Sequence, residues 1–259
     1  MLLLIDRLRQ ERLLMGYTAL MLAFLLAAWF LWFADERMVR DVNVWVKPMK
    51  FMASTAAFAL TTALFLSLLP ALVRKKRALQ VMVWVLVLTS TFEVVYITWQ
   101  GALGNGSHFN MASPVLAFMY GLMGFAALAL TSTQGYLAWV VMKHGLIFGG
   151  KVFTQSVALG LGLTFVLATI GGFMLGNLQP PAGQGIPLVG WHLAGGDLRP
   201  AHFLGVHANQ IIPIAGLILV TLQKKRISQS AAMGMLYLGA LAYVLIWLWL
   251  SLLGLNIGQ

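Results

Sequence analysis

Runs of apolar residues long enough to cross a bilayer recur along the whole chain, separated by short polar connections. A transmembrane helix needs about 20 mostly apolar residues, and only helices and closed barrels satisfy all backbone hydrogen bonds inside a membrane. We therefore predict an all-α fold, a polytopic transmembrane helix bundle of about seven spans. The predicted spans cover residues 14–34, 50–70, 78–100, 113–142, 152–176, 198–221 and 230–254.

The connections are too short to hold a soluble domain, so we interpret residues 1–259 as a single integral membrane domain. Residues 1–13 mix apolar and charged side chains, which predicts an interfacial amphipathic segment that leads into the first span. Residues 177–200 form the longest connection. Because this connection carries Trp191 among apolar residues, we expect a lid-like loop folded over the outer face.

Basic residues are distributed unevenly between the two sets of connections. With a cytoplasmic N-terminus, twelve of the 17 Lys and Arg residues fall in inner segments and five in outer segments. Basic residues in short loops are retained in the cytoplasm. The distribution predicts a cytoplasmic N-terminus, an extracytoplasmic C-terminus and a location in a bacterial-type inner (plasma) membrane.

The amino-acid composition is typical of a membrane protein. The chain is 60% hydrophobic and 9% charged, whereas soluble domains carry about 25% charged residues. The net charge of +10 follows from the topology, and no basic face with aromatic or polar readers indicates nucleic-acid binding. The lipid bilayer is therefore the expected partner. The absence of cysteine excludes disulfides and thiolate metal sites.

The fifth span is rich in glycine, a residue that lets membrane helices approach closely. We expect this span to lie inside the bundle or at a homo-oligomer seam. Its glycines are Gly160, Gly162, Gly171, Gly172 and Gly176.

Glu93 is the only acidic residue inside a predicted span. Thr89, Glu93, Tyr96 and Gln100 follow helical spacing and share one face. An intramembrane carboxyl needs a proton, a cation or a hydrogen-bond donor as its partner. We assign candidate catalytic roles to Glu93 and Tyr96. The structural alternative is a protonated glutamate that links two helices.

His207 lies about 15 Å along the sixth span from its outer end, if Asp197 is the N-cap. Asn209 and Gln210 follow, and Pro213 frees the carbonyl of Asn209, so a kinked polar patch is expected. We assign His207 to cofactor or metal binding. The structural alternative is a set of interhelical hydrogen bonds around the kink.

Three further histidines fall on the outer side of the predicted topology. His108 precedes the fourth span, His192 lies in the lid-like loop, and His202 lies one turn inside the sixth span. We predict His108 and His202 as cofactor ligands, and Glu93, His108, His192 and His207 as a metal-ligand set. Imidazole and carboxylate suit zinc, copper or iron, and two imidazoles from different helices suit haem b.

Lys47 and Lys50 share a face at the outer start of the second span. One interpretation is that both extend to lipid phosphates. The other is that they bind an anionic ligand or a haem propionate at the site, and both lysines are therefore candidate cofactor-binding residues.

Three functions are compatible with this pattern, and the pattern leaves open whether the chain is an enzyme. The first is a His/Glu site near the outer face that binds a transition metal or b-type haem, for redox or metal-assisted chemistry on a lipid-soluble or periplasmic substrate. The second is a proton-coupled small-molecule transporter or binding bundle. The third is a non-catalytic membrane subunit. Because Glu93 and His207 have similar predicted depths, we also expect them to face one shared polar cavity.

Overall fold

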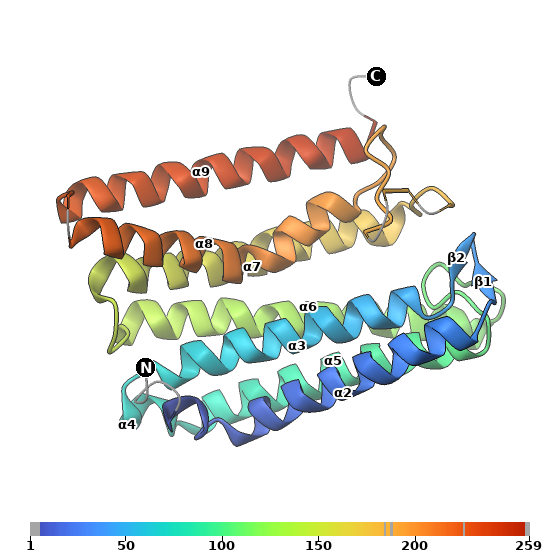
Figure 1. Cartoon of the computed structure of the whole chain (residues 1–259), viewed down its shortest axis with the longest axis horizontal. Coiled ribbons are helices and arrows are strands. Elements are labelled where there is room, and N and C mark those ends of the chain that lie inside the picture. Colours follow the sequence, from blue (N-terminus) through green and yellow to red (C-terminus); the bar gives the residue numbers. More distant parts are fainter. Residues whose placement is uncertain (1–5, 184, 187–188, 225, 257–259) are drawn as a thin grey trace. The chain divides into compact units, whose positions relative to one another are not determined.

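The structure is a computed structural model that describes residues 6–183, 185–186, 189–224 and 226–256 (Figure 1). Seven long helices dominate the described residues, and this confirms the predicted number of spans. They are α2 (Arg12–Ala34), α3 (Val46–Ser67), α5 (Arg77–Ala102), α6 (Pro114–His144), α7 (Gly150–Asn177), α8 (Arg199–Gln223) and α9 (Gln229–Gly254). The short helix α4 (Ala71–Arg74) lies between α3 and α5.

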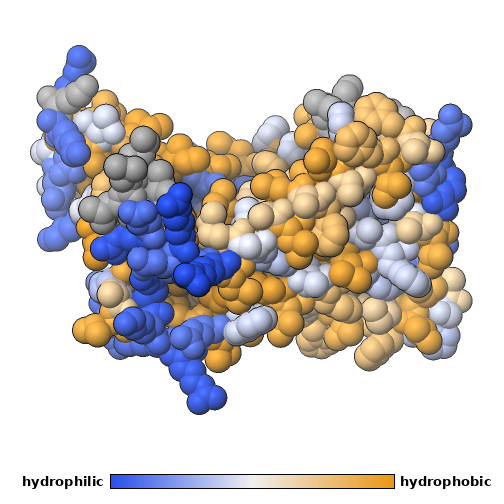
Figure 2. Space-filling model, turned by 60° about the horizontal axis from the view of Figure 1, so that its bottom comes forward, coloured by the Kyte–Doolittle hydropathy of each residue, from blue (hydrophilic) through white to orange (hydrophobic). Residues whose placement is uncertain are grey.

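Each of the seven helices has the length and apolar composition needed to cross a membrane. Figure 2 shows mostly hydrophobic residues along the sides of the helices and hydrophilic residues gathered towards the helix ends. Such a surface needs hydrocarbon around the middle of each helix and water or headgroups at its ends. The chain is thus built as a multi-pass membrane protein.

A small β-hairpin departs from the all-helical prediction. Strands β1 (Met38–Val39) and β2 (Val42–Asn43) pair antiparallel in the connection after α2. The two turn residues, Arg40 and Asp41, have φ values of 53° and 63°. Two consecutive positive φ values match the twist of a two-residue hairpin turn. Strands this short carry no readable alternation of apolar and polar residues, so the sequence did not predict them.

The observed helix ends lie close to the predicted ones except in α3. This helix begins at Val46 rather than at residue 50, and it ends at Ser67 rather than at residue 70. Pro48 occupies its first turn, where a missing N–H costs nothing. At the other end, Pro70 disfavours helical conformation in the residue before it.

Two details of the sequence interpretation concern helix starts. The N-cap of α8 is Leu198, so the prediction that Asp197 is the N-cap is wrong. The Asp197 carboxylate instead accepts hydrogen bonds from the Arg199 backbone N–H (2.9 Å) and guanidinium. In the predicted interfacial segment, residues 1–5 lie outside the described residues, and residues 6–8 are helical.

The chain divides into two compact units, which are described separately. Unit 1 comprises residues 1–67, 83–130 and 179–192, and unit 2 comprises residues 68–82, 131–178 and 193–259. In unit 1, α2 packs against α3, and Tyr17 Oη of α2 lies 2.8 Å from Ser90 Oγ of α5. Thr91 Oγ1 also donates to Tyr17 Oη. A shared hydroxyl cluster therefore joins α2 to α5.

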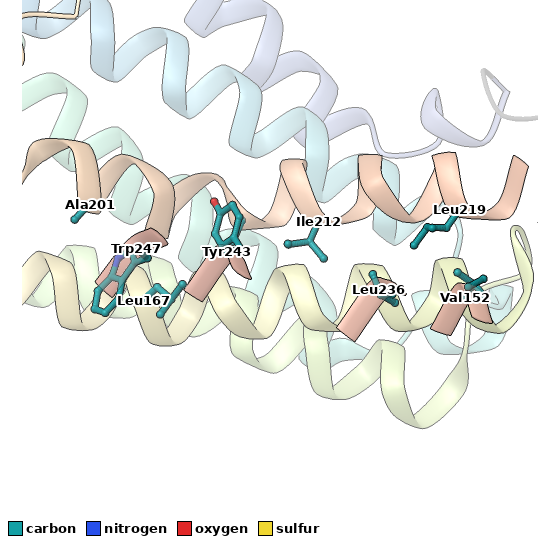
Figure 3. Close-up of a cluster of buried hydrophobic side chains, with 10 residues drawn as sticks. Val152, Leu167, Ala201, Ile212, Leu219, Leu236, Tyr243 and Trp247 are labelled. Atoms are coloured by element: carbon teal, nitrogen blue, oxygen red, sulfur yellow. The ribbon is translucent and has the colours of Figure 1, made fainter. Parts of the chain in front are cut away.

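In unit 2, α8 packs against both α7 and α9. Its core contains apolar side chains from these three helices, including Leu167, Ile212, Leu236 and Trp247 (Figure 3). A Cβ on Gly160 would lie 2.8 Å from the carbonyl oxygen of Ala208. Gly160 of α7 thus permits close packing against α8 within unit 2, and a homo-oligomer seam stays a prediction.

Candidate functional site

One face of α5 carries three buried polar side chains at successive turns. Glu93, Tyr96 and Gln100 expose 9%, 7% and 5% of their surfaces. Helical spacing of three and four residues brings them to the same side of α5. Among the described residues, Glu93 Oε1, Tyr96 Oη and Gln100 Oε1 are buried without a hydrogen-bond partner. Unpaired buried oxygens are costly in a membrane, so this face is suited to receive a polar ligand or water.

The start of α3 lies against the Gln100 end of this face. A Cβ on Gly101 would lie 2.9 Å from the carbonyl oxygen of Val44 and 3.4 Å from the Pro48 ring. Such close backbone approach brings Lys47, the neighbour of Pro48, near α5. The Lys47 ammonium lies within electrostatic reach of the Glu93 carboxyl. Two charged residues that were predicted separately thus belong to one site.

An apolar wall borders the polar face. The rings of Phe92 and Tyr96 stack with centroids 6.3 Å apart. Tyr96 also belongs to a buried cluster in which Phe51 and Met119 pack against it and its neighbours. Apolar walls lower the local dielectric constant, which strengthens electrostatic interactions at the polar atoms.

His108 lies beside this wall. Its ring centroid is 6.1 Å from that of Phe51 on α3 and 5.8 Å from that of Tyr120 on α6. Its Nδ1 lies 3.2 Å from Ser107 Oγ. Aromatic rings and a neighbouring hydroxyl therefore form its immediate surroundings.

The loop before α8 makes three hydrogen bonds with the rest of unit 1 through the loop backbone. Lys50 Nζ donates to Val189 O at 2.7 Å, and Arg40 donates to Pro180 O at 2.6 Å. Gly183 N donates to Arg40 O at 3.2 Å. Trp191 and His192 are half-buried in the same loop. Lys50 thus holds a loop carbonyl, a role that neither interpretation of the lysine pair anticipated.

The other two candidate histidines belong to α8 in unit 2. His202 rests against α7, where its Nδ1 lies 3.7 Å from the position of a Cβ on Gly171. Its Nδ1 is buried without a partner among the described residues. His207 is half-buried, its Nδ1 lies 3.2 Å from Gln210 Oε1, and its ring centroid is 4.3 Å from that of Phe203.

A buried polar network in unit 2 joins Asn209 to two residues, Gln134 and Thr164, that the sequence interpretation did not include. Asn209, which is 0% exposed, donates through Nδ2 to Gln134 Oε1 on α6 at 3.0 Å. Its backbone N–H donates to Thr164 Oγ1 on α7 at 2.8 Å. The polar segment that surrounds Gln134 interrupts an apolar run, and this interruption could have indicated a buried polar contact. The polar patch near Pro213 therefore includes interhelical hydrogen bonds, as the structural alternative proposed.

The candidate residues fall into both units. Lys47, Lys50, Glu93, Tyr96, His108 and His192 belong to unit 1, and His202 and His207 belong to unit 2. Within the described part of the chain, no group of three or more His, Asp or Glu side chains is arranged to hold a metal ion. The expected pairing of Glu93 with His207 involves both units and stays a prediction.

The strongest site is therefore the buried face of α5 with Lys47, which combines a carboxyl, a hydroxyl, an amide and a cation. Comparisons of the chain with protein-family models, with curated proteins and with solved structures found no match.

Proposed function

We propose that the chain is a proton-coupled binding or transport protein of a bacterial-type inner membrane, with its N-terminus in the cytoplasm. Its ligand is a small molecule that presents N–H or O–H donors to Glu93, Tyr96 and Gln100 near the outer face. Glu93 exchanges a proton as the ligand binds and leaves.

The observation that carries this proposal is the row of three buried oxygens without partners on α5. An ionised carboxylate and an amide oxygen only accept hydrogen bonds, and a phenol both donates and accepts. The row therefore requires donors from outside the helix. Glu93 and Gln100 lie seven residues apart, so a ligand or a water chain that reaches both spans about 10 Å.

Lys47 gives the site its second property. The Lys47 ammonium lies within reach of Glu93 and competes with a cationic ligand for the ionised carboxylate. When the carboxyl takes up a proton, it loses its charge and attracts neither cation. Such exchange is the basic step of proton coupling, and intramembrane carboxyls serve this purpose in pumps and transporters.

The experiment compares two ligands of equal charge that differ in N–H donors. Thermal unfolding of the purified protein is measured with ethanolamine, which has an ammonium group, and with choline, which has no N–H. A ligand that binds only the folded state raises the unfolding temperature by mass action. We expect ethanolamine to raise it in the wild type and choline to have a much smaller effect.

Two variants locate the effect. Glu93→Gln keeps the shape of the side chain but removes the charge, and it should abolish the ethanolamine shift. Thr98→Val serves as the control, because the Thr98 hydroxyl donates to Val94 O of its own helix and lies outside the polar row. The proposal fails if Glu93→Gln keeps the full shift or if choline stabilises the protein as well as ethanolamine does.

A b-type haem is the second candidate, because two axial imidazoles are enough to hold it. It is favoured by the unpartnered Nδ1 of His202, which would supply one axial ligand, while the second would come from another helix. An optical spectrum and a metal analysis of the purified protein test this candidate and the proposed zinc, copper or iron site together. A protein with neither a Soret band nor bound metal would contradict both.

A further inference from the structure

Two connections of unit 2 bring basic side chains together. Residues 74–77, with the sequence RKKR, run from the end of α4 to the start of α5, and Lys143 lies in the last turn of α6. The backbone N–H of Ile147 donates to Leu68 O at 3.0 Å, so the connection after α6 lies against the connection after α3. Cations from separate elements therefore gather at one end of the unit.

The packing of α7 on α8 adds further cations at this end. Figure 3 shows Val152 of α7 and Leu219 of α8 at one end of the buried cluster and Ala201 at the other. The exposed Lys151 directly precedes Val152. The exposed Lys224 follows Leu219 as the C-cap of α8. We call the surface formed by residues 74–77, 143, 151 and 224 the basic end of unit 2.

The sequence of unit 2 provides no acidic side chain to neutralise these cations. Its only acidic residue, Asp197, is paired with Arg199 at the start of α8. The basic end lies past the other end of this 25-residue helix, roughly 35 Å away. The ammonium groups of Lys76 and Lys143 both lie within electrostatic reach of the His144 ring. Like charges held this close gain from a bound anion.

Exposed apolar side chains accompany the basic residues. Leu72 of α4 exposes 86% of its surface, and Ile147 and Phe148 are exposed in the connection after α6. The Lys143 ammonium lies 4.9 Å from the centroid of the Trp139 ring. Apolar and aromatic groups beside cations are suited to the boundary between hydrocarbon and lipid phosphate. A soluble anion would leave Leu72 and Phe148 in water, so the surface favours a lipid.

We propose that the basic end of unit 2 binds an anionic phospholipid, whose phosphate is bound by Lys76 and Lys143. The proposal uses residues of unit 2 alone and does not depend on the ligand proposed for Glu93. The alternative is that these cations act only through the net charge of the chain. In that case, removal of any two exposed cations would have the same effect.

The test measures lipid binding to the purified, delipidated protein by native mass spectrometry. Phosphatidylglycerol is the anionic probe, and phosphatidylcholine with the same acyl chains is the zwitterionic one. Glycerol 3-phosphate, as a competitor, offers the phosphate without acyl chains. The test variant combines Lys76→Gln with Lys143→Gln, and the matched control combines Arg9→Gln with Arg12→Gln in unit 1. All four side chains are exposed, so both double variants should fold.

We expect the wild type to bind phosphatidylglycerol more tightly than phosphatidylcholine, and added salt should weaken the binding. The Lys76 and Lys143 double variant should bind phosphatidylglycerol about tenfold more weakly, because each basic residue near an anionic lipid adds to the attraction. The arginine control should bind like the wild type. The proposal is overturned if the two double variants bind equally, if phosphatidylcholine binds as tightly as phosphatidylglycerol, or if glycerol 3-phosphate displaces the lipid at equal concentration.

Discussion

Most of the basic residues that the predicted topology places outside are bound by oxygen atoms of this chain. The Arg37 guanidinium binds the Asp35 carboxylate and also donates to Ala102 O at the end of α5. Arg40 and Lys50 each hold a backbone carbonyl, and Arg199 is paired with its neighbouring aspartate. These contacts explain how positive charge can have a structural role on the side where loops carry few basic residues.

Asp35 binds several donors in and beside the β1–β2 hairpin. Its carboxylate accepts hydrogen bonds from the backbone N–H and guanidinium of Arg37 and from Trp45 Nε1 at 2.9 Å. The guanidinium holds the pKa of this carboxyl well below its ordinary value of 3.8. A pKa lowered by folding means that the stabilisation is present above the ordinary value and is lost only as the pH falls through the lowered one.

We therefore predict that Asp35→Asn loosens the hairpin to a similar extent at every pH from about 5 to 8, since Asp35 stays ionised there. Hydrogen–deuterium exchange of residues 35–45 is the measurement, and exchange should be faster in the variant. Asp41→Asn is the matched control, because Asp41 is exposed at the turn. Equal exchange in the two variants would show that the Asp35 contacts contribute nothing to the hairpin.

Residue spacing predicted part of the candidate site. Glu93, Tyr96 and Gln100 were expected on one helical face, and the structure buries all three on α5. The approach of Lys47 could not be predicted, because spacing within one helix says nothing about which neighbour its face meets. Gln134 was missed for another reason: the polar segment around it, residues 131–135, is short, so the hydropathy average over the whole span stays apolar.

Helices α7 and α8 show how small residues determine packing between elements. Gly160 of α7 meets the Ala208 carbonyl and the Pro213 ring, and Gly205 of α8 meets the backbone of Leu167 on α7. A methyl group at any of these contacts would collide with backbone or with a rigid ring. By contrast, a Cβ on Gly162 would find no atom within 4 Å.

Gly160→Ala is accordingly predicted to lower the free energy of unfolding by about 1–3 kcal/mol, as overpacking does elsewhere. Gly162→Ala should leave it unchanged or raise it by roughly 0.5–1 kcal/mol, since alanine favours helix. Unfolding of the purified variants in a denaturing detergent compares the two. A Gly162→Ala loss as large as that of Gly160→Ala would instead favour a homo-oligomer seam on the outer side of α7.

Element boundaries were predictable where a proline or a charged cluster limits the helix. The start of α3 could not be predicted in this way. Lys47 and Lys50 lower the mean hydropathy of its first turn, although both residues are helical. The hairpin was missed because β1 and β2 have two residues each. Hydropathy therefore found every long helix, and it failed where a few local hydrogen bonds decide the conformation.

At the scale of the whole molecule, the predicted orientation can be tested in cells, because the chain contains no cysteine. We predict that a cysteine replacing Asn105 reacts with a membrane-impermeant maleimide in intact cells, whereas one replacing Lys75 reacts only after permeabilisation. The cysteine-free parent measures background labelling. Labelling of the Lys75 variant in intact cells would reverse the topology and would place the Glu93 site towards the cytoplasm.

The contacts of Arg40 and Lys50 with the loop before α8 also constrain the order of events during synthesis. Their partners, Pro180 and Val189, follow 140 and 139 residues later in the chain. At about 5–20 residues per second, these cations wait roughly 7–28 s for the carbonyls that hold them. In the predicted topology they must therefore cross the membrane as unbound charges. The closing of the loop over α3 is then a late step, possible only after the first five spans have been made.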